Sequence, residues 1–334
     1  MAFSSANPRK RAKFSTMKKV LVLGGTGFVG RHVCEKLMRE QIRVTVVTRR
    51  RENARHLHVL PLVDVIELAS FDSASLAPLL AGHDAVVNLI AILHGTEAAF
   101  EKLHVGLPKA LVSACQASGV KRVVHISALG ASPDSASMYQ RSKARGEEVL
   151  RSSGLAVTLL RPSVIFGAED KFLNTFAKLQ QLFPVIPLAS SEARFQPVWV
   201  EDVASAVVHC LQNHDAIGKT YEACGPDVFT LRQLVELAGR YAGVNGGRGR
   251  PVIGLPAPLA RLQARLMELA PGEPMMSRDN LDAMKTDNVA SGKLPGLQAL
   301  GITPSALSAI APSYLGAQGL RSGLMAKRKT AGRF

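Results

Sequence analysis

Several features that would place a chain in a simple class are missing from this sequence. No uninterrupted apolar run approaches the roughly 18 residues that a membrane-spanning helix needs: the run at 155–160 meets Arg161, and the run at 85–93 contains Asn88. The four cysteines form no CxxC pair and no cluster with histidine, so neither a metal site nor a redox motif is indicated. No DNA-binding motif is present, so we do not expect nucleic acid as a partner. A globular protein with reduced, buried cysteines is expected, and the cytoplasm fits it.

Acidic residues are absent from both ends of the chain. The formal net charge is +15, of which residues 1–19 contribute six basic side chains and residues 317–334 contribute five, leaving +4 for the remainder. We expect residues 1–16 to be a basic flexible extension and residues 317–334 a basic tail. Each Lys or Arg near anionic lipid contributes about 1 kcal/mol, so these ends could touch a membrane or a membrane complex; solvated ends are the alternative.

Residues 1–16 have no apolar centre like that of a secretory signal; a transit-like presequence, an incidental extension and an upstream start remain open. The expected location is therefore cytoplasmic or peripheral at an inner membrane, which for a eukaryotic source means the mitochondrial matrix.

Apolar runs without internal alternation take turns with amphipathic segments along the first half of the chain. Such runs are typical of strands that are buried on both faces of a parallel sheet. Strands are predicted at 19–25, 42–50, 63–70, 84–93, 121–130 and 155–167, and helices at 28–40, 75–82, 97–118 and 139–152. The alternation predicts an α/β fold, with a Rossmann-type, doubly wound parallel sheet over residues 17–167.

The pattern changes after Gly167. Residues 168–316 carry a helix near 172–182, a proline-rich stretch, and a further helix with Thr230 as its N-cap. Residues 198–228 read as a strand, a helix and another strand that return to the first domain. Residues 256–316 read as helices separated by Pro and Gly. We expect a smaller, mostly helical region on the substrate or partner side.

Three glycines follow the first predicted strand in the stretch VLVLGGTGFVGRHV. Gly24, Gly27 and Gly30 form GxxGxxG at a strand-to-helix turn. The first glycine allows the tight turn, the second allows backbone to approach a pyrophosphate, and the third allows the helix to pack on the strand. The N–H groups at the start of the helix would then face the phosphates. The sequence therefore predicts a dinucleotide site.

The end of the second strand distinguishes the two nicotinamide dinucleotides. An acid there binds the ribose 2′-hydroxyl of NAD, whereas an arginine accommodates the 2′-phosphate of NADP. Here the chain reads VVTRRREN, with no acid before Glu52. A guanidinium binds phosphate through two parallel hydrogen bonds. NADP(H) is favoured over NAD(H), with Arg49 as the first candidate ligand and Arg50 as the second; a solvated arginine edge is the alternative.

A tyrosine and a lysine four residues apart suggest acid–base chemistry. Tyr139 and Lys143 share one face of the predicted helix. A lysine ammonium beside a phenol lowers the phenol pKa from about 10, which makes it a usable general acid or base. Ser127 ends the fifth predicted strand, where its hydroxyl could bind a substrate carbonyl. These three residues are the candidate catalytic set.

These motifs together resemble a known family. GGTGFVG, the Ser127/Tyr139/Lys143 set, RPSVIFG and FQPVWVEDVA are similar to the extended, atypical short-chain dehydrogenases/reductases. Within that superfamily, PVIPLASSEARFQPVWVEDVA and GEPMMSRDNLDAMKTDNVASGKLPGLQALGITP resemble the NADPH-binding accessory subunit of respiratory complex I and its bacterial relatives. The resemblance covers about residues 18–316.

The resemblance implies a role for individual residues. It implies that the pyrophosphate is contacted by Gly24, Thr26, Gly27, Phe28, Val29 and Gly30, and the 2′-phosphate by Arg49. It implies that the adenosine ribose is contacted by Leu89, Ile90 and Ala91. The nicotinamide half would be bordered by Ser127, Tyr139, Lys143, Pro162 and Ile165. The family's third strand commonly ends with an adenine-binding Asp, whereas this chain has Ala69 and Ser70 there and Asp72 only later.

The resemblance leaves three functions open. In the complex I subunit the NADPH is regarded as structural, which implies a nucleotide-holding assembly or regulatory protein. The Ser–Tyr–Lys set instead favours an NADP(H)-dependent reductase or isomerase acting on a small quinone-like or lipid-like substrate. A sugar-nucleotide epimerase or dehydratase is the alternative; against it, SALGA carries no acid after Ser127, and residues 168–197 offer only Lys171, Lys178 and Arg194 as cations.

Overall fold

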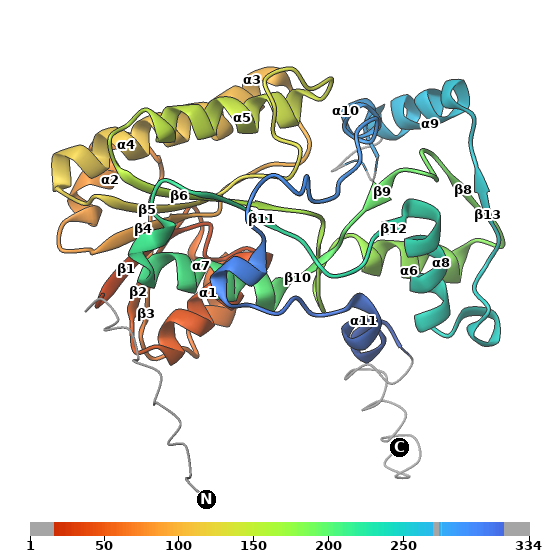
Figure 1. The fold of residues 1–334 in the computed structure, drawn as a ribbon, viewed down its shortest axis with the longest axis horizontal. Helices are drawn as coiled ribbons and strands as arrows, with labels where there is room; N and C mark the ends of the chain where they lie inside the picture. Colours follow the sequence, from red (N-terminus) through yellow and green to blue (C-terminus); the bar gives the residue numbers. More distant parts are fainter. Residues whose placement is uncertain (1–16, 270–273, 275, 317–334) are drawn as a thin grey trace, which may run out of the picture.

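A seven-stranded parallel sheet forms the centre of the larger lobe (Figure 1). The computed structural model describes residues 17–269, 274 and 276–316. The strands run in the order β11-β6-β5-β4-β1-β2-β3, and all neighbours pair in parallel. They are β1 (Lys19–Leu23), β2 (Arg43–Thr48), β3 (Val63–Glu67), β4 (Ala85–Asn88), β5 (Arg122–Ile126), β6 (Ala156–Pro162) and β11 (Thr220–Ala223). The predicted Rossmann-type α/β sheet is confirmed.

Helices cover both faces of this sheet. α1 (Phe28–Arg39) and α7 (Val200–Gln212) pack with the strand side chains of one face, including Val20 and Val22. The helices α2 (Ser73–Leu80), α4 (Leu107–Ser118) and α5 (Met138–Arg151) cover the other face, where Leu21 and Leu23 are buried. Consecutive residues of β1 therefore enter opposite cores, as the two-residue period of a strand requires.

The predicted strands extend past the observed ones at their carboxyl ends, three of them by four residues or more. The strand predicted at 84–93 ends at Asn88, and the strand predicted at 121–130 ends at Ile126. The strand predicted at 155–167 divides into β6 and the separate β7 (Ile165–Phe166). The residues beyond each strand are mostly apolar, so their composition does not distinguish them from strand. They form the loops at the carboxyl edge of the sheet, where ligands bind in this class of fold.

The smaller lobe combines helices with short two-stranded pairings (Figure 1). β7 pairs with β10 (Val198–Trp199), β9 (Arg194–Phe195) with β12 (Phe229–Thr230), and β8 (Ile186–Leu188) with β13 (Val252–Gly254). The helices are α6 (Leu173–Leu182), α8 (Leu231–Tyr241), α9 (Ala257–Leu269), α10 (Arg278–Ala283) and α11 (Leu307–Leu315). Thr230 caps α8 as predicted, within a capping box completed by Gln233.

Two of the sequence predictions concern the cellular compartment of the protein. All four cysteines are buried and unpaired, as predicted. Within the described residues, no helix is both long and apolar enough to cross a membrane. The basic extension and the basic tail lie outside the residues that the structure describes.

Candidate functional site

The glycine turn joins β1 to α1 through very close backbone packing. Gly24 has φ +82°, and a Cβ there would lie 3.2 Å from the backbone nitrogen of Ile90. A Cβ on Gly30 would collide with the carbonyl oxygen of Gly24. No side chain caps the start of α1 at Gly27, and its first turn contains no acid. The N–H groups of the first turn of α1, which no side chain caps, make a site for an anion together with the helix dipole.

The remaining predicted pyrophosphate residues lie at the same turn. Thr26 is half-buried in the turn itself, and Phe28 and Val29 begin α1. The ring of Phe28 packs against Gly167, where a Cβ would lie 3.1 Å from Phe28 Cζ. The glycine turn thus contacts the segment that follows β7.

The loop after β4 lies directly against the glycine turn. The backbone N–H of Leu89 donates to Leu23 O at 2.9 Å, and that of Ile90 donates to Asn88 Oδ1 at 3.1 Å. Ala91 follows and is exposed. The structure therefore brings Leu89 and Ile90 beside Gly24, although Leu89 lies 65 positions further along the chain.

Arg49 and Arg50 follow β2 and are both exposed. The hydroxyl of Thr48 accepts a hydrogen bond from Arg50 N at 3.3 Å and donates one to Arg50 O at 3.1 Å, which fixes the backbone of this bend. Neither guanidinium forms an ion pair within the described part of the chain. Both remain available to an anion near the end of β2.

Ser127 and Lys143 are almost completely buried. Ser127 is 4% exposed, and its Oγ has no hydrogen-bond partner among the described residues. Lys143 is 1% exposed; its Nζ donates to Ile126 O at 2.8 Å, and burial lowers its pKa to about 8. A buried hydroxyl without a partner is costly, and a ligand that offers a polar group to Ser127 would remove that cost.

Tyr139 packs against the stacked rings of Phe100 and His104. Its ring meets that of His104 at 5.4 Å and that of Phe100 at 6.0 Å, both edge to face. Burial raises the pKa of Tyr139 to about 12. The prediction that Lys143 lowers this pKa is therefore wrong for the structure as it stands, because burial disfavours the charged phenolate.

Pro162 borders the Ser127 loop from the next strand, β6. Pro162 O accepts a hydrogen bond from Leu129 N at 2.9 Å, and Ser127 N donates to Leu160 O at 2.7 Å. Ile165 in β7 pairs with Val198. The end of β6 therefore fixes the loop that carries Ser127.

The sequence reasoning missed His104, which connects three parts of the site. The residue lies in a π-helical segment, Glu101–Gly106, within the predicted helix 97–118. Ile92 N donates to His104 Nε2 at 3.2 Å, while Nδ1 lies 2.7 Å from Ser142 Oγ. Burial, with the charge of Lys143, lowers the pKa of His104 to about 3, so the ring is neutral and Nδ1 carries its hydrogen. Ser142 in turn donates to Tyr139 O at 2.7 Å, so His104 connects the loop after β4 to the helix of Tyr139.

A glycine makes this contact possible. A Cβ on Gly146 of α5 would collide with His104 O, so α5 can approach the π-helical segment only where a side chain is absent. π-Helical turns are frequent at functional sites, but no periodic pattern in the sequence predicts one.

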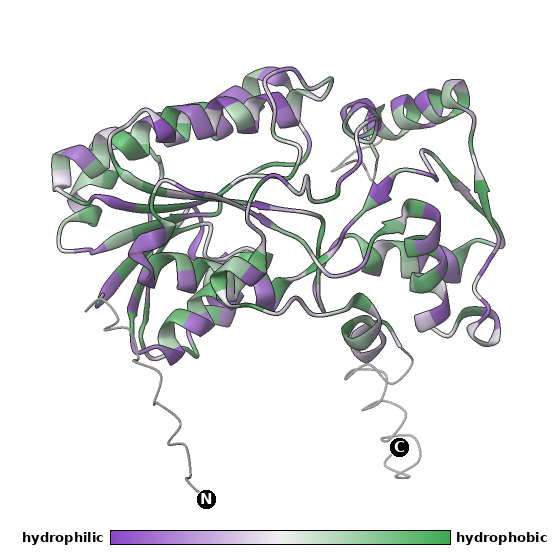
Figure 2. Cartoon of the chain, viewed as in Figure 1, coloured by the Kyte–Doolittle hydropathy of each residue, from purple (hydrophilic) through white to green (hydrophobic). Residues whose placement is uncertain are grey.

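Asp279 was also missed, although it caps the helix that carries Tyr139 and Lys143. From α10 in the smaller lobe, its carboxylate accepts hydrogen bonds from Ser137 Oγ at 2.9 Å, Met138 N at 2.5 Å and Tyr139 N at 3.2 Å. α5 is largely hydrophilic (Figure 2), and it nevertheless buries Ser142 and Lys143. Its position consequently depends on polar contacts, of which the cap from Asp279 is one.

We expect replacement of Asp279 by alanine to destabilise the fold by about 1–2 kcal/mol, because the part-buried N–H groups of Met138 and Tyr139 lose their acceptor. Chemical denaturation measures the change. Asp282→Ala is the matched control, since Asp282 is on the same helix but bonds only to Arg261 and Lys285 at the surface. Equal stabilities of the two variants would refute the role given to Asp279.

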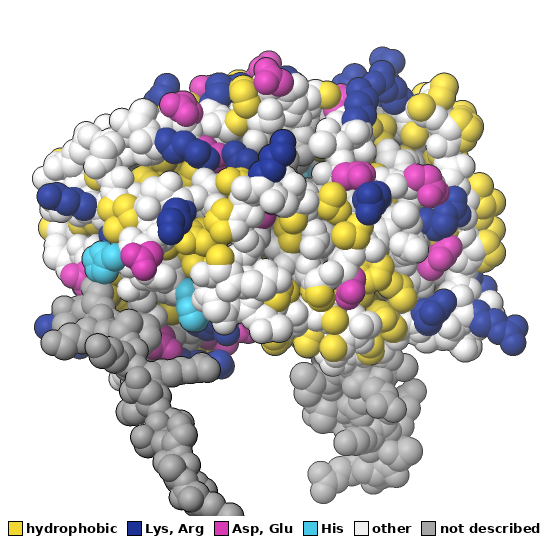
Figure 3. All heavy atoms as spheres, in the orientation of Figure 1, with side chains coloured by type: hydrophobic (Ala, Val, Ile, Leu, Met, Phe, Trp, Pro, Cys, Tyr) yellow, Lys and Arg dark blue, Asp and Glu magenta, His cyan; other side chains and the backbone are white. Residues whose placement is uncertain are grey.

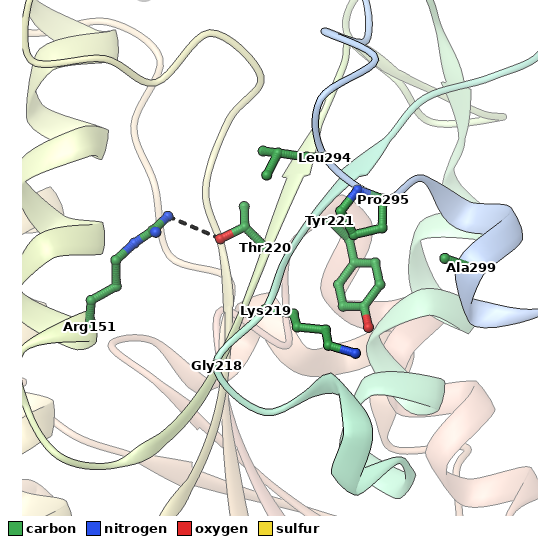
Figure 4. Close-up of a pocket in the computed structure, with 8 residues that line it drawn as sticks. All are labelled: Arg151, Gly218, Lys219, Thr220, Tyr221, Leu294, Pro295 and Ala299. Atoms are coloured by element: carbon green, nitrogen blue, oxygen red, sulfur yellow. Dashed lines mark hydrogen bonds between the residues drawn. The ribbon is translucent and has the colours of Figure 1, made fainter.

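A surface depression lies elsewhere in the larger lobe. It has a volume of about 480 Å³ and is lined by residues that include Arg151, Lys219 and Tyr221 (Figure 4). Gly218 and Thr220 place it at the amino end of β11, opposite to the edge that carries the glycine turn. Arg151 points to Thr220 Oγ1, at 3.0 Å, and also bonds Glu147. Since parallel sheets bind ligands at carboxyl ends, this depression is not the nucleotide site.

The family follows from comparison with known proteins. A family model described as "NAD dependent epimerase/dehydratase family" matches residues 20–224, from β1 to the end of β11. The chain belongs to this family. The resemblance predicted from the sequence is thereby confirmed, and so is dependence of the family on a nicotinamide dinucleotide.

Two relatives refine the position of this epimerase/dehydratase-family chain. It is 34% identical over 296 residues to "NADH dehydrogenase [ubiquinone] 1 alpha subcomplex subunit 9, mitochondrial" of Mus musculus, covering 86% of the chain and 76% of the relative. The protein of the same name from Arabidopsis thaliana is 31% identical over 312 residues, covering 88% and 76%. Among solved structures, the NADPH-dependent quinone oxidoreductase QOR2 of Escherichia coli, complexed with NADPH, superposes with a TM-score of 0.72 at 21% identity, covering 89% of this chain and 99% of QOR2. At that identity the likeness shows the fold alone.

Proposed function

We propose that this chain binds NADP(H) across the glycine turn and holds it as a fixed component of a membrane-associated NADH dehydrogenase assembly. The observation that carries the proposal is the similarity to two complex I subunits, which extends well past the nucleotide-binding half of the chain. The site supports the nucleotide part. The uncapped start of α1 would receive the pyrophosphate, and the exposed Arg49, with Arg50, would bind the 2′-phosphate.

The residues of the expected nicotinamide half, Tyr139 and Lys143, favour a protein that holds the nucleotide over one that turns it over. Tyr139 has its pKa raised to about 12, whereas an efficient general acid has a pKa near the working pH. The ammonium of Lys143 is occupied by Ile126 O at 2.8 Å. A bound nicotinamide would lie near Ser127 and Tyr139, and its role there would be to complete the packing of the two lobes.

A second candidate is an NADP(H)-dependent reductase, and one observation favours it. Ser127 Oγ is buried without a partner among the described residues, as a hydroxyl kept for a substrate carbonyl would be. The sugar-nucleotide alternative gains no such support, because no acid follows Ser127 in SALGA.

Tyr139→Phe separates the two candidates. The holding function predicts that neither wild type nor variant oxidises NADPH with a panel of quinones and carbonyls, while both retain the nucleotide. A reductase predicts turnover by the wild type that falls by about 10²–10⁴ in the variant, the usual contribution of a general acid. Single-turnover absorbance of NADPH, with bound nucleotide quantified after desalting, gives both readings. Wild-type turnover that Tyr139→Phe abolishes would overturn the holding function and establish the reductase.

A further inference from the structure

Helix α9 carries its large apolar side chains on the face that points away from the protein, whereas a helix that only packs on the protein buries them. Ala260 and Ala264 are buried against Leu281 of α10, so small residues form the inward face. The outward face bears Leu259, Leu262, Leu266 and Leu269, which are 53–77% exposed. Their spacing of i, i+3, i+7 and i+10 places them in one stripe along the helix.

Exposed apolar side chains continue beside this helix. Ile253 in β13, just before α9, is 55% exposed. Leu182, Phe183 and Val185, which lead into the paired strand β8, are also exposed. Figure 3 shows hydrophobic side chains over α9 and along the edge that β8 and β13 form. Contiguous apolar surface of this kind marks a site of interaction rather than a solvated face.

The charges beside the stripe select the partner. Arg261 and Arg265, one turn apart, form a row next to the leucine row, and both are exposed. Asp282 lies 2.7 Å from Lys285 and only 3.5 Å from Arg261, and Glu268 is bonded to Arg278 at 2.8 Å, so the stronger partner of each acid is a residue outside the arginine row. Leucines with a flanking row of guanidinium groups are the arrangement that places apolar side chains among acyl chains and arginines at lipid phosphates.

The geometry points to α9 as a docking surface for an anionic membrane; we propose that the helix lies in the lipid interface with its leucine stripe inserted. α9 is at an outer corner of the smaller lobe (Figure 1), so a flat surface can reach it without a rearrangement. The proposal does not depend on bound nucleotide or on turnover. It also differs from contacts through the basic ends, because the stripe would supply apolar insertion as well as charge.

Vesicle co-sedimentation of the full-length protein tests the proposal. Vesicles of phosphatidylcholine alone are compared with vesicles of equal parts phosphatidylcholine and phosphatidylglycerol. We expect the double variant Leu262→Gln/Leu266→Gln to lose at least about tenfold in partitioning onto the anionic vesicles, since two inserted leucines are lost. Arg261→Gln/Arg265→Gln should lose about 30-fold on the anionic vesicles, since each of the two arginines contributes about 1 kcal/mol near anionic lipid, and little on the neutral ones.

Val59→Gln is the matched control, because Val59 is 79% exposed and lies in the nucleotide-binding lobe. It should bind vesicles like the wild type. Melting temperature and NADPH retention should be the same in all variants, since every substituted side chain is exposed. Wild-type binding by the leucine variant would assign attachment to the basic ends and overturn the proposal. So would a wild type that ignores vesicles but forms a dimer that the leucine variant loses, because the stripe would then join two copies of the chain.

Discussion

Replacing Gly30 by alanine is expected to weaken NADPH binding by about 100-fold, the upper range of what an overpacked contact costs. The added Cβ would collide with Gly24 O, where α1 rests on the end of β1. Relief of that collision must move either the glycine turn or the first turn of the helix. Both carry the N–H groups that would face the pyrophosphate. Isothermal titration calorimetry with NADPH measures the loss.

Gly106→Ala is the control for this experiment. Gly106 has helical backbone angles, and a Cβ there would lie 3.7 Å from its nearest neighbour, Glu101 O, which is an ordinary contact. It should bind NADPH like the wild type. If Gly30→Ala also binds NADPH normally with an unchanged melting temperature, the nucleotide does not lie on this turn.

Replacing Arg49 by alanine is expected to lower affinity for NADPH by about 10–100-fold and leave affinity for NADH nearly unchanged. A charge-assisted hydrogen bond contributes about 1.5–3 kcal/mol, and the 2′-phosphate is the only group that distinguishes the two coenzymes. Arg50→Ala should have a smaller effect, because Thr48 holds the Arg50 backbone on both sides and limits where its side chain can reach.

Arg55→Ala supplies the comparison for charge alone. Arg55 is exposed in the 3₁₀ helix Arg51–Leu57. Its replacement by alanine removes the same charge a few residues further along the chain. It should change the affinities for both coenzymes little and equally. An unaltered NADPH-to-NADH ratio in both Arg49→Ala and Arg50→Ala would show that the end of β2 does not select the coenzyme.

Short-range patterns predicted the sheet and its glycine turn because both are encoded locally. The apolar runs specify strands buried on both faces, and the spacing of Gly24, Gly27 and Gly30 is set by contacts within one β–α unit. Strand ends were less predictable. The loop that begins at Leu89 is as apolar as β4, but it leaves the sheet to lie against Gly24.

Long-range contacts explain what sequence reasoning missed. Asp279 caps α5 from about 140 residues away, and no local pattern connects the two. The pKa of Tyr139 depends on burial beside Phe100 and His104. The prediction from the YxxxK spacing took account of the lysine alone. A motif specifies which side chains share a helix face, but the elements packed on that face decide their chemistry.

The most direct test of the account is a calorimetric titration of nucleotide-free, full-length protein with NADPH and with NADH. The account predicts a Kd of about 1 μM or lower for NADPH and clearly weaker binding of NADH. Absence of binding by both coenzymes, with no change in melting temperature at saturating concentrations, would contradict it.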